Sequence, residues 1–207
     1  MAQWRHKPVW MDQGFLGWHL ITVACVFSKS PTYTREHVLR LERMVSENMK
    51  QPHRFVCLDD SPFSGWWAKI SLFQPGRFQG RVLYLDLDVT ITGSLDELAD
   101  YPGSFVICRD WGRFGYNSSV MAWDAGTADH LYTDFIQSSD SIMSKLRGDQ
   151  DWITAKKPEA STFPRGWCFS YRLGKRIGFP KDVRVIVYHG RPKPWSLPDN
   201  DLEVLRV

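Results

Sequence analysis

Several patterns that assign a chain to a familiar class of protein are missing from this sequence. Its 207 residues contain no run of about eighteen apolar residues, and residues 1–20 contain no uninterrupted apolar segment, so neither a transmembrane helix nor a signal peptide is indicated. The basic residues are dispersed rather than gathered in blocks, and the net charge is only +3, which argues against a nucleic-acid partner. We therefore expect a soluble, cytoplasmic protein.

Sequence motifs for zinc and for phosphate are also missing. The four cysteines are far apart, and no two of them have the C-x-x-C spacing of a zinc site. Cys25, Cys57 and Cys108 stand within apolar runs, so we expect buried, reduced thiols. No G-x-G-x-x-G follows the first apolar run and no G-x-x-x-x-G-K-[ST] occurs, which excludes a dinucleotide fingerprint and a Walker loop. If the protein binds phosphates, another group such as a metal ion has to hold them.

The sequence does have the apolar content and the periodicity of a single α/β domain. Apolar residues make up 43% of the chain, and runs typical of strands alternate with helical patterns. This order predicts a mostly parallel central sheet with helices on both faces, and loop-rich segments at residues 1–20 and 156–180. The predicted strands are residues 20–27, 53–60, 82–89, 104–110, 117–124 and 183–189, and the predicted helices are residues 34–49, 65–73, 94–101 and 126–137.

The segment VLYLDLDVTITG, from Val82 to Gly93, carries the strongest chemical signal. Four apolar residues typical of a buried strand lead directly into Asp86 and Asp88. Side chains of an extended segment alternate, so these two carboxylates should point the same way, beyond the end of a strand, where open α/β sheets bind ligands. Two carboxylates so close repel each other unless a proton or a cation lies between them, and a divalent metal ion is the common solution. The alternative is a pair of solvated turn residues.

Four motifs along the chain resemble those of a known enzyme family. They are YLDLDVTITGSLDEL, YNSSVMAW, GDQDW and YHGRPKPW, in the order found in the retaining glycosyltransferases of family eight, the glycogenin and bacterial galactosyltransferase type. Together with WWAKISLF before the third strand, they cover most of residues 23–195. The resemblance implies a single domain with the GT-A nucleotide-diphospho-sugar transferase fold over residues 1–207. It also implies a metal-dependent enzyme that moves a hexose from a nucleotide-diphosphate sugar, usually a UDP-sugar, to a hydroxyl acceptor with retention of configuration.

The same resemblance implies which residues bind the donor and its metal ion. Asp86 and Asp88 match the D-x-D pair that binds Mn²⁺ or Mg²⁺, and oxygen ligands suit either ion. His189 lies in the loop whose histidine completes the metal site, although the family's histidine commonly stands at the position that Val187 holds here. The donor-binding residues that the motifs imply are Tyr33, Lys69, Asn117, Ser118 and Lys193.

The GDQDW segment is similar to the family's G-D-Q segment, and the resemblance therefore places Asp149 and Gln150 beside the reacting sugar. Retention ordinarily proceeds by double displacement with a carboxylate nucleophile. A front-face route, in which the departing diphosphate takes the acceptor's proton, is the alternative, and the sequence does not choose between the two. Plainer roles exist for three residues: Asp149 as a helix cap, Lys69 as a solvated helix lysine and His189 as a surface histidine.

Two other functions are compatible with the motifs. DLDVT also fits the D-x-D-x-[TV] nucleophile loop of haloacid-dehalogenase-type phosphatases. In those enzymes the first Asp follows the first strand, whereas two predicted strands and two predicted helices precede Asp86. A catalytically inactive protein that only binds sugar nucleotides is the second alternative. Assays for sugar transfer and for phosphate release distinguish the three functions.

Overall fold

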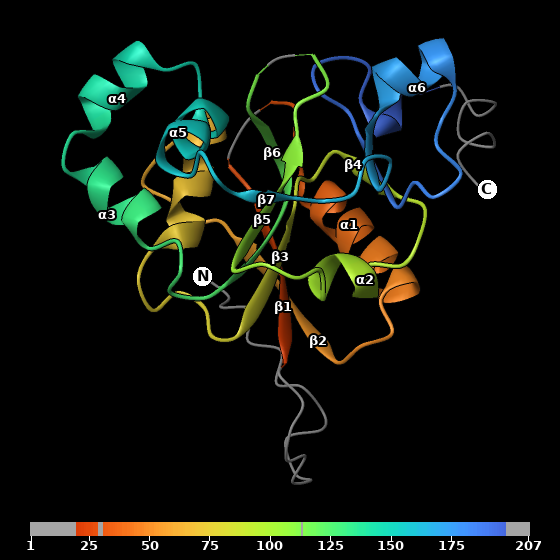
Figure 1. Cartoon of the computed structure of the whole chain (residues 1–207), viewed down its shortest axis with the longest axis horizontal. Helices are drawn as coiled ribbons and strands as arrows, with labels where there is room; N and C mark the ends of the chain where they lie inside the picture. Colours follow the sequence, from red (N-terminus) through yellow and green to blue (C-terminus); the bar gives the residue numbers. More distant parts are fainter. Residues whose placement is uncertain (1–19, 29–30, 113, 198–207) are drawn as a thin grey trace, which may run out of the picture.

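The computed structural model of the protein describes residues 20–28, 31–112 and 114–197, so the expectation of loops before residue 20 lies outside the described residues. A six-stranded sheet stands between two layers of helices (Figure 1). Its strands are β1 (Ile21–Val26), β2 (His53–Leu58), β3 (Arg81–Leu85), β5 (Phe105–Arg109), β6 (Tyr116–Asp124) and β7 (Ser161–Thr162). The helices are α1 (Arg35–Asn48), α2 (Asp96–Ala99), α3 (His130–Ile136), α4 (Ser139–Lys145), α5 (Asp149–Lys156) and α6 (Tyr171–Ile177), with 3₁₀ helices η1 (Gly65–Phe73) and η2 (Pro194–Ser196).

The strand order across the main sheet is β2-β1-β3-β6-β5-β7. β1 pairs in parallel with β2 and β3, β6 is antiparallel to both β3 and β5, and β7 is parallel to β5. β5 therefore runs in the same direction as β3, and β6 alone is reversed within this sheet. The predicted α/β fold with a mostly parallel central sheet and helices on both faces is confirmed.

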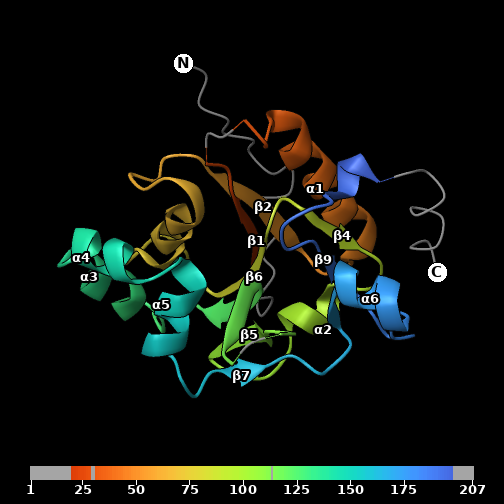
Figure 2. The same ribbon diagram turned by 90° about the horizontal axis from the view of Figure 1, so that it is seen from above.

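Alternating side chains along the strands build a separate core on each face of the sheet. Val23 and Cys25 of β1 face the layer formed by α1 and α2, whereas Ala24 and Val26 face η1, α3 and α5. Seen from above, the two helical layers lie on opposite sides of the strands (Figure 2). Because both faces are covered, the central strands consist of apolar runs, which is why the sequence predicted them correctly.

A small second sheet lies beside the α1 face and carries the C-terminal loop. It consists of β4 (Val89–Ile91), β9 (Val185–Val187) and β8 (Cys168–Ser170), with β9 antiparallel to β4 and parallel to β8. Arg40 of α1 donates to the carbonyl of Val89 at 2.9 Å, so helix and sheet are tied together. This sheet brings residues near the C-terminus next to the D-x-D segment.

The structure corrects the prediction of one strand over residues 82–89. β3 ends at Leu85, Leu87 and Asp88 form a turn, and β4 belongs to the second sheet. The backbone N–H of Asp86 bonds to the carbonyl of Ser119 at 2.9 Å, while Val89 already pairs with Val187. The extended alternation expected for the two carboxylates is therefore wrong, because the chain changes sheets between them.

Three further expectations need correction. The helix predicted from residue 126 begins only at His130, and residues 65–73 form a 3₁₀ helix rather than an α-helix. The segment 156–180 contains β7, β8 and α6 in addition to loops. Short elements of two to seven residues have too few periodic positions to be recognised in sequence. Their stability depends on tertiary pairing, of β7 with β5 in the main sheet and of β8 with β9 in the second.

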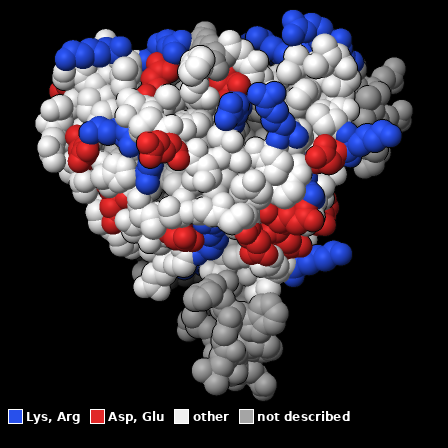
Figure 3. Space-filling view, in the orientation of Figure 1, with Lys and Arg blue, Asp and Glu red and all other residues white. Residues whose placement is uncertain are grey.

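The described residues also bear on the thiols and on membrane association. All four cysteines are free, and Cys25 and Cys108 are buried as expected, whereas Cys57 is only partly buried; Cys168 is buried as well. Within the part of the chain that the structure covers, no helix combines the length and the apolar character needed to cross a bilayer. Lysine and arginine side chains are spread over the surface among acidic groups, with several along the upper edge in Figure 3.

Candidate functional site

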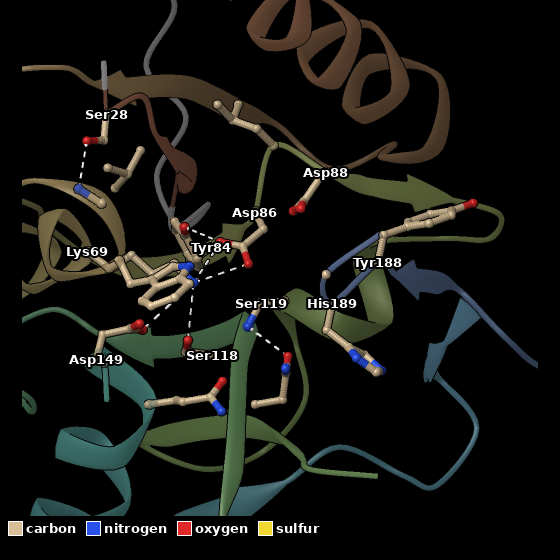
Figure 4. Close-up of a pocket in the computed structure, with 18 of the residues that line it drawn as sticks. Ser28, Lys69, Tyr84, Asp86, Asp88, Ser118, Ser119, Asp149, Tyr188 and His189 are labelled. Carbon is tan, nitrogen blue, oxygen red and sulfur yellow. Dashed lines mark hydrogen bonds and ion pairs between the residues drawn. The ribbon is translucent and has the colours of Figure 1, made fainter. Parts of the chain in front are cut away.

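A cavity of about 520 Å³ opens at the edge of the main sheet where β1 and β3 end. Its walls also come from the start of β6, the start of α5 and the loop after β9. The structure brings together in this cavity all ten side chains that the motifs implied: Tyr33, Lys69, Asp86, Asp88, Asn117, Ser118, Asp149, Gln150, His189 and Lys193. Figure 4 labels six of them, Lys69, Asp86, Asp88, Ser118, Asp149 and His189.

Lys69 is the centre of one group of charged side chains. Its Nζ lies 2.8 Å from Asp86 Oδ1 and 3.7 Å from Asp149 Oδ2, and it donates to Ser118 Oγ at 3.1 Å. Tyr84 donates its hydroxyl to Asp86 Oδ1 at 2.6 Å. We call these five residues the Lys69 cluster; Figure 4 shows them converging from η1, β3, β6 and α5.

Burial determines the protonation behaviour of the Lys69 cluster. Lys69 is 9% exposed and Asp149 is 3% exposed. Burial alone lowers the pKa of Lys69, but the carboxylates of Asp149 and Asp86 together outweigh it, so the pKa is raised and the ammonium stays charged. Burial raises the pKa of Asp149, and the charge of Lys69 works against that rise. The plain reading of Lys69 as a solvated helix lysine is therefore wrong.

Lys193 is the centre of a second group, on the other side of the cavity. Lys193 Nζ forms an ion pair with Asp88 Oδ2, and Tyr33 donates its hydroxyl to the same oxygen at 2.9 Å. Burial, followed by the charge of Asp88, raises the pKa of Tyr33, which keeps the phenol a neutral donor. We call Lys193, Asp88 and Tyr33 the Lys193 cluster. Each acid of the D-x-D pair thus has its own lysine and its own tyrosine.

The remaining predicted residues are positioned by the starts of two elements. Asn117 lies near the start of β6, is 5% exposed, and accepts a hydrogen bond from the backbone N–H of Ser119 at 3.0 Å. Asp149 and Gln150 are the first two residues of α5, and Gly148 takes the cap position. The reading of Asp149 as the helix cap is therefore wrong, and its carboxylate belongs to the Lys69 cluster instead.

His189 lines the cavity but has partners of its own. Its Nε2 lies 2.6 Å from Ser170 Oγ, and its ring stacks on Trp111 with 5.8 Å between ring centroids. Burial and then the nearby guanidinium of Arg172 lower the pKa of His189, which favours the neutral imidazole. The geometry does not place His189 in a metal site. Among the described residues, no three His, Cys, Asp or Glu side chains are grouped closely enough to hold a metal ion. Asp86 and Asp88 supply carboxylate oxygens of the kind that Mn²⁺ and Mg²⁺ prefer, and His189 is not grouped with them.

Some residues of the cavity were not singled out in the sequence. Trp66 is 67% exposed, lines the cavity, and lies against Gly148, whose added Cβ would stand 3.5 Å from the indole. Arg147 also lines the cavity and pairs with Asp151 at 2.8 Å. Trp66 is the first residue of WWAKISLF and Arg147 directly precedes GDQDW, and these positions were the signal that could have found them.

Comparison with known proteins gives matches in structure but none in sequence. No protein-family model matches the chain, and no curated protein matches it. The structure of the glycosyltransferase GlyE of Streptococcus pneumoniae TIGR4 superposes with a TM-score of 0.62 and 16% identity, covering 91% of this chain and 61% of GlyE. The fold is that of glycosyltransferases.

Two further structures support this assignment of the fold. The galactosyltransferase LgtC, in complex with donor and acceptor sugar analogs, has a TM-score of 0.60 at 15% identity, covering 89% of this chain and 95% of LgtC. A glycosyltransferase involved in the glycosylation of the major capsid of PBCV-1 has a TM-score of 0.57 at 12% identity, covering 91% of this chain and 100% of that one. The chain spans about three fifths of GlyE but nearly all of LgtC.

Proposed function

We propose that this protein is a metal-dependent glycosyltransferase that moves a hexose from a UDP-sugar to a hydroxyl acceptor with retention of configuration. The observation that carries the proposal is the convergence of ten side chains, spread from residue 33 to residue 193, on one cavity of a glycosyltransferase fold. The motif resemblance selected these residues before their positions were known. Their clustering gives the cavity two acid–lysine pairs, one at each acid of the D-x-D segment.

The chemistry of transfer matches the charges of the cavity. The bond between the anomeric carbon and the diphosphate oxygen breaks, a bond from that carbon to the acceptor oxygen forms, and the acceptor hydroxyl loses its proton. Negative charge therefore builds on the diphosphate, and fixed positive charge nearby lowers the barrier. We assign Lys193 to the diphosphate, Asn117 and Ser118 to the donor, and Tyr33 to the nucleotide base.

The metal ion is assigned to the D-x-D pair. Asp86 and Asp88 would hold Mn²⁺ or Mg²⁺, with oxygens of the diphosphate as further ligands, and the bound ion would supply positive charge to the leaving group. Lys193 forms an ion pair with the Asp88 carboxylate in this structure. Binding of the donor with its metal ion would therefore replace the Lys193 ammonium by the metal ion at that carboxylate. His189 would join the ion only if its ring left Ser170 and Trp111.

The sugar end of the cavity is assigned to the start of α5. Asp149 is the buried carboxylate next to Lys69, and Gln150 follows it along the helix. A carboxylate held there with its negative charge balanced by an ammonium can stabilise a positively charged, oxocarbenium-like sugar. This role is compatible with double displacement and with the front-face route.

Substitution of the D-x-D acids tests the proposal. We expect Asp86→Asn and Asp88→Asn to abolish sugar transfer, or slow hydrolysis of UDP-sugars, together with Mn²⁺-dependent UDP binding, while the circular dichroism spectrum is retained. Asp140→Asn, on the exposed surface of α4, is the matched control and should behave as the wild type. A thermal-shift screen of nucleotide sugars with and without Mn²⁺ identifies the donor, because a ligand of the native state raises its melting temperature. Normal turnover by Asp88→Asn after chelation of metals would refute the proposal.

The phosphatase alternative is not favoured by the structure. Asp86 would be the nucleophile of such an enzyme, yet Lys69 and Tyr84 bond to its carboxylate, and Asp86 follows β3 rather than the first strand. Trapping with beryllofluoride followed by mass spectrometry detects an aspartyl-phosphate mimic. We expect no adduct at Asp86 and no release of phosphate from small phosphomonoesters.

A further inference from the structure

A second cavity, of about 510 Å³, lies close to the donor cavity. Its lining comes from the end of β5, the loop after β7, and β8. Trp111 lines the second cavity and stacks on His189, which lines the first. Ser170, at the end of β8, holds the same imidazole through its hydroxyl. The two cavities are therefore neighbours, linked by the stacked rings of Trp111 and His189, although none of the described residues lines both.

The floor of the second cavity is apolar. Cys108 and Phe163 are buried, with exposed fractions of 2% and 5%, and Cys168 is buried beside them. The indole of Trp111 adds a flat aromatic face at the side nearest the donor cavity. Such a surface suits the apolar face of a sugar ring or of another flat, weakly polar group.

The mouth of this cavity carries two arginines, Arg109 and Arg165, both exposed. Within the described part of the chain, neither guanidinium has a hydrogen bond or an ion pair. Arg172, in the neighbouring helix α6, differs because it already donates to the carbonyl of Arg191 at 2.7 Å. The planar guanidinium presents donors in a fork that matches the oxygens of a carboxylate or a phosphate.

One acid lines the same cavity as these arginines. Asp110 also lines the cavity, and its Oδ1 accepts the backbone N–H of Gly112 at 2.7 Å. Its charge reduces the positive potential of the cavity but does not cancel it, since two guanidinium groups oppose one carboxylate. The combination of an apolar floor with a net positive mouth selects a ligand that has an apolar face and an anionic end.

We infer that the second cavity receives the acceptor and that this acceptor carries a phosphate or a carboxylate, which Arg109 and Arg165 bind. The inference rests on the proposed function, because only a transferase needs a second substrate beside the donor. An acceptor anchored at the arginines lies over Phe163 and Trp111, and its other end reaches toward His189 and the donor cavity. A neutral sugar would leave both guanidinium groups without partners.

Calorimetric titration of the full chain, saturated with UDP and Mn²⁺ so that the donor cavity is filled, tests the inference. The probes are glucose 6-phosphate, glucuronate and uncharged methyl glucoside. We expect one or both anionic probes to bind, and their relative affinities tell whether the cavity favours a phosphate or a carboxylate. Arg109→Gln and Arg165→Gln should each weaken that binding about tenfold, as expected from loss of a charged hydrogen bond. Arg43→Gln, exposed on α1, is the matched control and should change nothing.

The outcomes separate this inference from the proposed function. Binding of methyl glucoside as tight as that of the anions, no binding of either anion, or unchanged binding in both glutamine variants would overturn the inference. The proposed function would survive each of these results if UDP still bound in a Mn²⁺-dependent way. Loss of anion binding in the two variants with unchanged UDP affinity would support the anionic acceptor.

Discussion

In both the Lys69 cluster and the Lys193 cluster, a lysine balances the charge of one D-x-D carboxylate, but the two lysines stand on different parts of the fold. Each pairs one acid of the D-x-D segment with one lysine and one tyrosine hydroxyl. Lys69 stands on η1 within the core of the main sheet, and it balances Asp149 as well as Asp86. Lys193 stands on a loop whose neighbours His189, Gly190 and Arg191 are exposed, and it balances Asp88 alone.

This difference indicates that the half of the cavity around Lys69 is preorganised by the fold, whereas the half around Lys193 can rearrange when ligands bind. Removing Lys69 would leave buried carboxylates without a counter-charge, so the folded state depends on that lysine. Lys193 is held mainly by Asp88 and by the carbonyl of Tyr188, contacts that a diphosphate and a metal ion could replace. We therefore expect substitutions in the Lys69 cluster to change stability, and substitutions in the Lys193 cluster to change ligand affinity.

The largest effect is expected for Lys69→Met. Removal of the ammonium leaves the buried Asp149 and the half-buried Asp86 without their counter-charge, and the free energy of unfolding should fall by about 3–5 kcal/mol. Urea denaturation measures this change, with Lys145→Met at the exposed end of α4 as control. Adding Asp149→Asn, which removes one of the two charges, should restore part of the loss. A decrease below about 1 kcal/mol, typical of a surface pair, would abolish the distinction between the clusters.

Lys193→Ala is expected to have the next largest effect, on binding. The affinity for UDP in the presence of Mn²⁺ should fall by about 1.5–3 kcal/mol, the range for hydrogen bonds to charged groups. The melting temperature without nucleotide should stay close to that of the wild type. Calorimetry and thermal unfolding measure the two quantities, with the exposed Lys181→Ala as control. A large loss of stability with unchanged UDP affinity would make the C-terminal loop a structural turn.

The two tyrosines offer the smallest and most closely matched comparison. Tyr84→Phe removes a 2.6 Å hydrogen bond to the charged Asp86 from a side chain that is 1% exposed, and hydrogen bonds to charged groups contribute about 1.5–3 kcal/mol of stability. Tyr33→Phe removes the hydroxyl 2.9 Å from Asp88, and we expect the free energy of unfolding to fall by only about 0.5–1.5 kcal/mol. The aromatic ring remains, so its stacking on a nucleotide base should be retained. Denaturant unfolding gives both values. Equal losses would show that the two halves are equally preorganised.

The sequence predicted long elements better than short ones. The runs around Val23, Leu83 and Val106 became central strands because residues buried on both faces have to be apolar. The turn at Leu87 and Asp88 escaped prediction, since the apolar residues before it and the β-branched residues after it read as one strand. α6 and β8 were missed for a related reason: they are short, and their formation depends on β9, which arrives later in the chain.

By itself, the sequence determined the α/β class and the main strands, because apolar periodicity is a local property of the chain. The resemblance of its motifs to a known family implied the ten side chains that line the first cavity. Only the tertiary structure decided how those side chains pair. That Asp86 faces Lys69 and Asp149 while Asp88 faces Lys193 and Tyr33 follows from the change of sheet between the two acids. Pairing of charges depends on distance and burial in space, and neither is encoded in the spacing of residues along the chain.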